Sequence, residues 1–163
     1  MKNQWLSASS AGLQIRFNPQ HTLPPVARRY LNSPVHPIRP KIAHMWNNRD
    51  RNTLWWRVST SQLQSFKRVV RSWCARRTRI AFKEALKHHS FDSLGAPLST
   101  TDFKQQDALI GTLELIIRPS LVNQSHESLQ RDTNHLLAKI LKKRAINFER
   151  ANTYPAQSSN LRS

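Results

Sequence analysis

The chain has 163 residues, the length of one ordinary domain, and carries 26 Lys and Arg against 9 Asp and Glu, for a formal charge of +17. A sequence pI near 11.5 keeps it strongly positive at physiological pH, which favours a partner that supplies negative charge. Three glycines and a single cysteine exclude collagen-like chains, glycine-rich linkers, disulfide scaffolds and multi-cysteine zinc modules.

The positive charge is unevenly distributed. Residues 1–49 hold seven Lys and Arg and no acid, and residues 50–89 hold ten Lys and Arg against two acids. Residues 90–118 reverse the sign, with four acids against two bases, and residues 119–163 have seven bases and three acids. We therefore expect the middle of the chain to pack, and the basic blocks to meet a partner.

The first segment, residues 1–49, is predicted to be a basic, proline-rich leader and linker. Six of the nine prolines lie between Pro19 and Pro40, where they forbid a continuous helix. Ahead of them, Leu6, Leu13 and Phe17 recur at helical spacing in an acid-free stretch. The alternative is an ordinary disordered basic arm.

This leader resembles a mitochondrial presequence. It is amphipathic, contains serine, lacks acids and is followed by Arg28, Arg29 and Tyr30, a context similar to a matrix-protease cleavage site. The resemblance implies a mitochondrial matrix protein whose mature form begins near Leu31; otherwise a nuclear or cytoplasmic location is expected. No transmembrane segment is predicted, because the longest apolar run, residues 109–117, is far short of the ~20 residues needed.

A short aromatic strand is predicted over residues 53–58, followed by a long helix over residues 62–89 that a serine or threonine at 59–61 would cap. Trp55 and Trp56 are adjacent on this strand, so their side chains should point to opposite faces of the sheet. Together with Trp73 they could stack on unpaired bases, although packing in the core is the more common role of such residues.

One face of the long helix is predicted to be basic. At 100° per residue, its cations share one sector without an acid, while Phe66, Val70, Trp73 and Ile80 fall on the other side. Arg77 lies on the apolar side and should stack on an aromatic ring or pair with an acid. We expect the basic face to contact a phosphate backbone through five residues: Arg68, Arg76, Arg79, Lys83 and Lys87.

After the long helix, Gly95 and Pro97 predict a turn, and residues 109–117 predict a strand buried on both faces, with Gly111 at a bulge or a close backbone approach. A second helix is expected over residues 125–146. Its last turns carry the second candidate nucleic-acid contact, Lys142, Lys143 and Arg144, which could also be a nuclear import signal or complement the helix dipole.

The predicted architecture is an α+β domain over residues 50–147, with one long basic amphipathic helix, a C-terminal helix and two or three short strands. Both termini, including a tail over residues 148–163, are expected to be disordered. Two strands make a thin sheet, so either further strands lie near residues 38–45 and 98–103 or an acidic protein partner completes the core.

No catalytic, cofactor or metal motif is found. The sequence lacks phosphate-binding glycine loops, and the seven histidines form no pair at ligand spacing. No cofactor, no metal and no catalytic residue are therefore predicted, and a non-enzymatic role is favoured over an enzymatic one. Cys74 falls within the long helix and is expected to be a buried, inert thiol.

The function expected from these features is non-enzymatic association with RNA rather than DNA, for example as a mitochondrial ribosome or RNA-processing accessory. One alternative is an assembly factor or scaffold that binds an acidic protein or an anionic membrane surface. Another is a nuclear DNA-associated factor that uses Lys142 to Arg144 for import.

Overall fold

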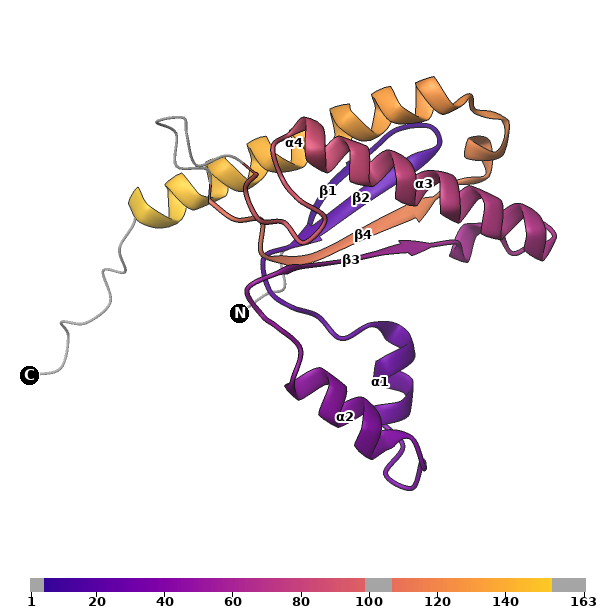
Figure 1. The fold of residues 1–163 in the computed structure, drawn as a ribbon, viewed down its shortest axis with the longest axis vertical. Coiled ribbons are helices and arrows are strands. Elements are labelled where there is room, and N and C mark those ends of the chain that lie inside the picture. Colours follow the sequence, from indigo (N-terminus) through magenta and orange to yellow (C-terminus); the bar gives the residue numbers. More distant parts are fainter. Residues whose placement is uncertain (1–4, 99–106, 154–163) are drawn as a thin grey trace, which may run out of the picture.

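The computed structural model describes residues 5–98 and 107–153, the side chains of residues 150–153 excepted. It is an α+β fold built on a four-stranded sheet in the order β1-β2-β4-β3 (Figure 1). The strands are β1 (Leu6–Ser9), β2 (Leu13–Asn18), β3 (Leu54–Ser59) and β4 (Gly111–Ile117). Strand β2 pairs antiparallel with β1 and β4, whereas β3 and β4 are parallel. The predicted fold class is confirmed.

Two long helices cover one face of this sheet. Helices α3 (Arg68–His88) and α4 (His126–Thr153) lie side by side across it, with short 3-10 turns at Ser61–Leu63 and Pro119–Asn123. Helix α3 connects the parallel strands β3 and β4, as a βαβ unit requires. Two further helices, α1 (Pro25–Leu31) and α2 (Arg39–Asn47), join β2 to β3 and project from the other side of the sheet (Figure 1).

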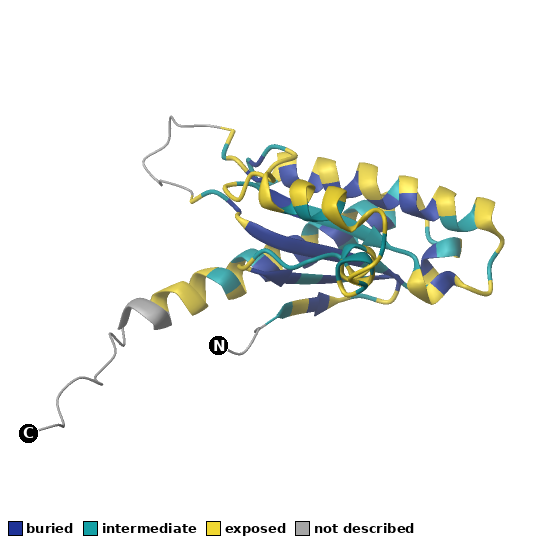
Figure 2. Ribbon diagram, turned by 90° about the horizontal axis from the view of Figure 1, so that it is seen from below, coloured by how far each residue is buried: buried dark blue, intermediate teal, exposed yellow. Residues whose placement is uncertain are grey.

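The core lies between the sheet and the two long helices. Leu13, Ile15 and Phe17 alternate along β2 and are fully buried, opposite their register partners on β4, Ile117, Leu115 and Leu113. The buried stripes of α3 and α4 close this layer, and their outer faces remain exposed (Figure 2). The main helical contributors are Phe82, Ala85, Leu86, Leu136, Leu137 and Ile140.

The helical leader predicted over residues 6–17 is wrong, because this segment forms the β1–β2 hairpin. Leu13, Ile15 and Phe17 recur at every second residue, which is the period of a strand. Pairing with β4 stabilises that strand over the competing helix. The hairpin turn is closed by Ser10, whose amide donates to the carbonyl of Leu13 at 2.7 Å. These two strands supply the sheet partners that the predicted two-strand domain lacked.

Other boundaries also differ from expectation. The strand proposed near residues 38–45 is instead helix α2, which starts with a proline in its first turn. Helix α3 begins at Arg68 rather than residue 62, and no side chain caps it. Helix α4 runs on to Thr153, so residues 148–153 are helical rather than disordered. The other proposed strand, at residues 98–103, lies largely outside the described residues.

The buried strand, the turn at Gly95 and the close backbone approach at Gly111 occur as predicted. Strand β4 is buried on both faces apart from partly exposed Ile116. Gly95 has φ 84° and Gly111 has φ 130°, the region that favours glycine. A side chain at Gly111 would collide with the carbonyl of Asn18 on the neighbouring strand, which is the close approach expected there.

Candidate nucleic-acid interface

Helix α3 is an unbroken rod with one buried and one exposed side. Its buried side consists of small or apolar residues, including Cys74, Thr78 and Phe82, which pack on the sheet and α4. The Thr78 hydroxyl donates to the carbonyl of Cys74 at 2.9 Å, so this polar group is satisfied inside the core. The helix is therefore fixed in rotation, and its other side must face solvent.

The five predicted phosphate contacts of α3 all lie on that solvent side. Each of Arg68, Arg76, Arg79, Lys83 and Lys87 is exposed, and none pairs with a carboxylate of the described residues. At ~1.5 Å per residue they extend along ~28 Å of helix. Ser72 lies among them, and the exposed acid Glu84 forms no ion pair within the described part of the chain. The result is a row of unneutralised cations along a rigid element.

Three apolar residues share this exposed side, contrary to the sequence prediction for two of them. Trp73 is 47% exposed, and Val69 and Ile80 are also exposed. Helical spacing of 100° per residue predicts Trp73 and Ile80 on the buried side of α3. In the structure, the side of α3 that contacts α4 and the sheet does not include them. Arg77 lies 4.3 Å above the Trp73 ring and donates to the carbonyl of Gln124 at 2.7 Å, which confirms the predicted stacking.

The other two tryptophans are packed within the fold, on opposite faces of β3 as predicted. Trp56 lies on the helical side against Phe82 and donates to the carbonyl of Ser93. Trp55 lies on the open side and is only 4% exposed. His21 stacks on Trp55 with ring centroids 4.1 Å apart, and the Arg49 guanidinium lies 4.1 Å from the same centroid. The Trp55 ring is therefore not available to stack on a base.

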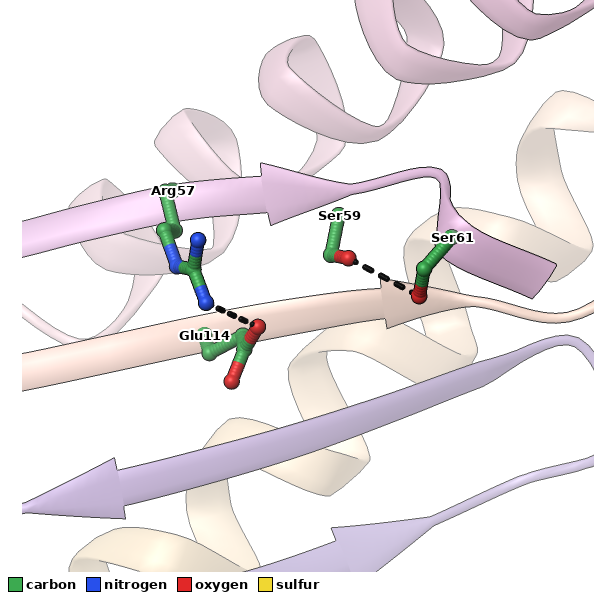
Figure 3. Close-up of polar contacts among 4 residues, drawn as sticks. All are labelled: Arg57, Ser59, Ser61 and Glu114. Carbon is green, nitrogen blue, oxygen red and sulfur yellow. Dashed lines mark hydrogen bonds and ion pairs between the residues drawn. The ribbon is translucent and has the colours of Figure 1, made fainter. Parts of the chain in front are cut away.

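The open face of the sheet carries a partly buried ion pair. Arg57 on β3 and Glu114 on β4 are register partners, and their side chains meet at 2.6 Å (Figure 3). Further along the same edge, the Ser59 and Ser61 hydroxyls share a hydrogen bond of 3.1 Å (Figure 3). These contacts fix the end of β3 relative to the start of the segment that leads into α3.

A cavity of about 260 Å³ opens beside this ion pair, between the sheet and the segment that contains α1 and α2. Its wall combines tryptophans and cations that the sequence analysis did not group into one site: Trp5, Arg28, Arg49, Trp55, Trp56 and Arg57. Burial lowers the pKa of Arg49. No spacing rule connects these residues, because they come from four separate parts of the chain. The sequence signals among them were the Trp55–Trp56 pair, named as possible stacking residues, and Arg28, named in the presequence context.

The second candidate contact, on α4, is divided by the structure. Lys142 is exposed, but the Lys143 ammonium donates to the carbonyl of Ser7 at 2.6 Å and so holds strand β1. Arg144 is half-buried and donates to the carbonyl of Ala108 at 2.8 Å. Burial lowers the pKa of Arg144, and nearby Asp107 opposes this effect. Two of the three cations therefore already bind backbone.

Two titratable groups near α3 have a shifted pKa: Cys74 on its buried side and His89 directly after its last residue. Burial raises the pKa of the Cys74 thiol, and Arg77 lowers it by less, so the thiol is protonated and packed as predicted. Burial also lowers the pKa of His89, whose ring lies 3.3 Å from the carbonyl of Asn134. That hydrogen bond raises the pKa by a smaller amount, and neighbouring His88 lowers it further.

Within the described residues, no cluster of three or more His, Cys, Asp and Glu side chains could hold a metal ion. None of the helices described is both long enough and apolar enough to cross a bilayer.

No protein-family model matches the chain, and no curated protein matches it. Among solved structures, the RNase P protein of Staphylococcus aureus is similar over 83% of each chain, with 13% sequence identity and a TM-score of 0.39. At that TM-score the two proteins are not shown to share a fold.

Proposed function

We propose that this protein is a non-enzymatic RNA-associated protein that docks through the exposed side of α3. The observation that carries the proposal is the row of five exposed cations without a carboxylate partner on a helix fixed by its buried side. Neutralising phosphates with such a row releases counterions, which favours binding at moderate salt. Arginine supplies three of the five, and its planar fork matches phosphate oxygens.

Trp73 favours RNA over duplex DNA as the polyanion. Its ring is exposed within the cationic row and already has a guanidinium on one side. Unpaired bases of folded RNA can stack on such a ring, whereas the bases of a DNA duplex are stacked on one another. We place the protein in a ribonucleoprotein, as a ribosomal or RNA-processing accessory, with the mitochondrion as the proposed compartment.

The test compares two triple charge reversals that change the net charge equally. In the first, Arg76→Glu, Arg79→Glu and Lys83→Glu reverse three of the five cations of the α3 row. In the second, Arg29→Glu, Arg39→Glu and Lys41→Glu change exposed cations of α1 and α2. Binding of a structured RNA is measured by filter retention over a range of salt concentrations.

We expect the α3 variant to lose about tenfold or more in affinity at moderate salt, and its salt dependence to fall by about two to three counterions. The control variant should stay within about threefold of the wild type. Equal losses in the two variants would mean that only net charge matters, and unchanged retention by the α3 variant would remove the proposal.

A further inference from the structure

The two helices between β2 and β3 form a projecting arm, residues 25–47, on the side of the sheet away from α3 and α4 (Figure 1). The arm is attached at its base, where Trp46 packs edge-on against Trp55 with ring centroids 5.1 Å apart. At its far end, Tyr30 contacts His36 across the turn between the helices. Neither helix contains a buried residue.

Helices this short need something to pack against. With seven and nine residues, both are below the ~12–15 residues at which an isolated helix becomes even marginally stable. Yet apolar side chains of the arm point into solvent: Val35 is 88% exposed and Met45 58% exposed, and Val26 and Ile38 are exposed too. Ile38, Ile42 and Met45 recur on one face of α2.

The charge of the arm is of one sign. Arg28, Arg29, Arg39 and Lys41 are exposed, and the chain has no acid before Asp50. A second copy of the arm would be repelled. The surface that complements the arm must therefore be anionic and must also accept apolar side chains, and RNA meets the first requirement but not the second.

We propose that the α1–α2 arm docks on an anionic lipid surface, with Val35 and Met45 entering the boundary between headgroups and acyl chains and the four cations lying among the headgroups. The apolar groups are spread over two short helices and the turn between them, which suits a fluid interface better than the shaped groove of a protein. Half-buried Tyr30, near the far end of the arm, is an amphipathic aromatic of the kind enriched at such interfaces. Helix α3 is left free on the other side of the molecule.

The experiment uses the full chain, treated with nuclease, in flotation with vesicles of phosphatidylcholine alone or with about one third cardiolipin. The test variant carries Val35→Ser and Met45→Ser, both at exposed positions where folding should be unaffected. The matched control carries Arg76→Glu and Arg79→Glu on α3. We expect the wild type and the α3 control to float with anionic vesicles only, and the test variant to lose about fivefold or more of that binding while keeping its affinity for RNA.

An environment-sensitive fluorophore provides a second measurement. It is attached at Val35→Cys on the arm or at Ser72→Cys on α3, both in a Cys74→Ala background. Anionic vesicles should shift the emission of the arm probe to the blue and leave the α3 probe unchanged. The proposal is overturned if flotation is lost in the α3 control rather than in the test variant, if neutral vesicles bind equally well, or if the arm binds an acidic peptide but no vesicle.

Discussion

Arg57 and Glu114 face each other across the two parallel strands of the sheet, with a guanidinium nitrogen 2.6 Å from a carboxylate oxygen. The Glu114 side chain is 12% exposed and little hydrated, whereas the Arg57 side chain is 37% exposed and partly hydrated. The cost of breaking the pair should therefore depend on which member is removed.

Removing the arginine leaves a carboxylate that is poorly solvated. We expect Arg57→Ala to lower the free energy of unfolding by about 1–2 kcal/mol, less than for a fully buried pair because Arg57 is partly exposed. Replacing both residues by leucine should recover most of that loss. Urea denaturation of the two variants measures the difference, and a double variant less stable than Arg57→Ala would contradict the argument.

The N-terminal hairpin should be indispensable for folding. Ile15→Ala removes a fully buried side chain of β2 and should cost about 2–5 kcal/mol, whereas the neighbouring Gln14→Ala should cost about 0.5 kcal/mol or less. Deletion of residues 1–30 removes both β1 and β2 and should abolish the cooperative unfolding transition. A truncated chain that still unfolds cooperatively would show that the hairpin is dispensable.

The same hairpin bears on the proposed mitochondrial location. Cleavage near Leu31 would discard two of the four strands, so import should leave residues 6–18 attached. A fluorescent fusion that carries Arg28→Ala and Arg29→Ala, both exposed, tests targeting without removing the strands. We expect weakened import of that variant and a full-length wild-type chain in the organelle. A mature chain that begins at Leu31 would contradict this expectation.

Trp73 should contribute to RNA binding more than to stability. Because its ring is 47% exposed, Trp73→Leu should weaken binding of single-stranded RNA by about fivefold or more and change the unfolding free energy by less than about 1 kcal/mol. Ile80→Ser, on the same exposed side of α3, is the matched control. Equal losses of affinity in both variants would indicate a general effect of the surface rather than base stacking.

The lowered pKa of His89 predicts loss of stability in mild acid. The unfolded chain takes up a proton near the ordinary pKa of 6.5, whereas the folded chain resists it, so protonation favours unfolding as the pH falls below that value. Wild-type stability to urea should therefore decrease between about pH 7.5 and pH 5. His89→Gln should show a smaller decrease, and an identical pH profile for the two proteins would rule out this origin.

Local signals were sufficient for some elements. Neighbouring residues alone predict the strand within the apolar run 109–117, the end near His89 of the helix that lacks Gly and Pro, and the turn at Gly95. The structure has all three where they were expected. The β1–β2 hairpin was missed because Leu6, Leu13 and Phe17 fit a helical period, while the competing alternation is stabilised by pairing with β4, about a hundred residues away, and by packing against α4.

The same limit applies to the site. The five cations of α3 were found because a helix places them by spacing alone, but which residues share their sector depends on packing against α4. Trp73, which was predicted to lie in the core, is therefore found on the surface. The cavity lined by Trp5, Arg28 and Arg49 could not be found, since those residues meet only after the sheet has closed.

Because β4 lies between β2 and β3 and is the last of the four strands to be synthesised, the complete sheet cannot assemble until residues 111–117 have emerged. The β1–β2 hairpin can pair locally, but β2 must wait for its second partner strand, which is synthesised roughly a hundred residues later, and such distant pairing is slow. During that interval the nascent chain is strongly basic and the β2 edge that later pairs with β4 is unpaired. An early encounter with nucleic acid or with a chaperone would shield that edge.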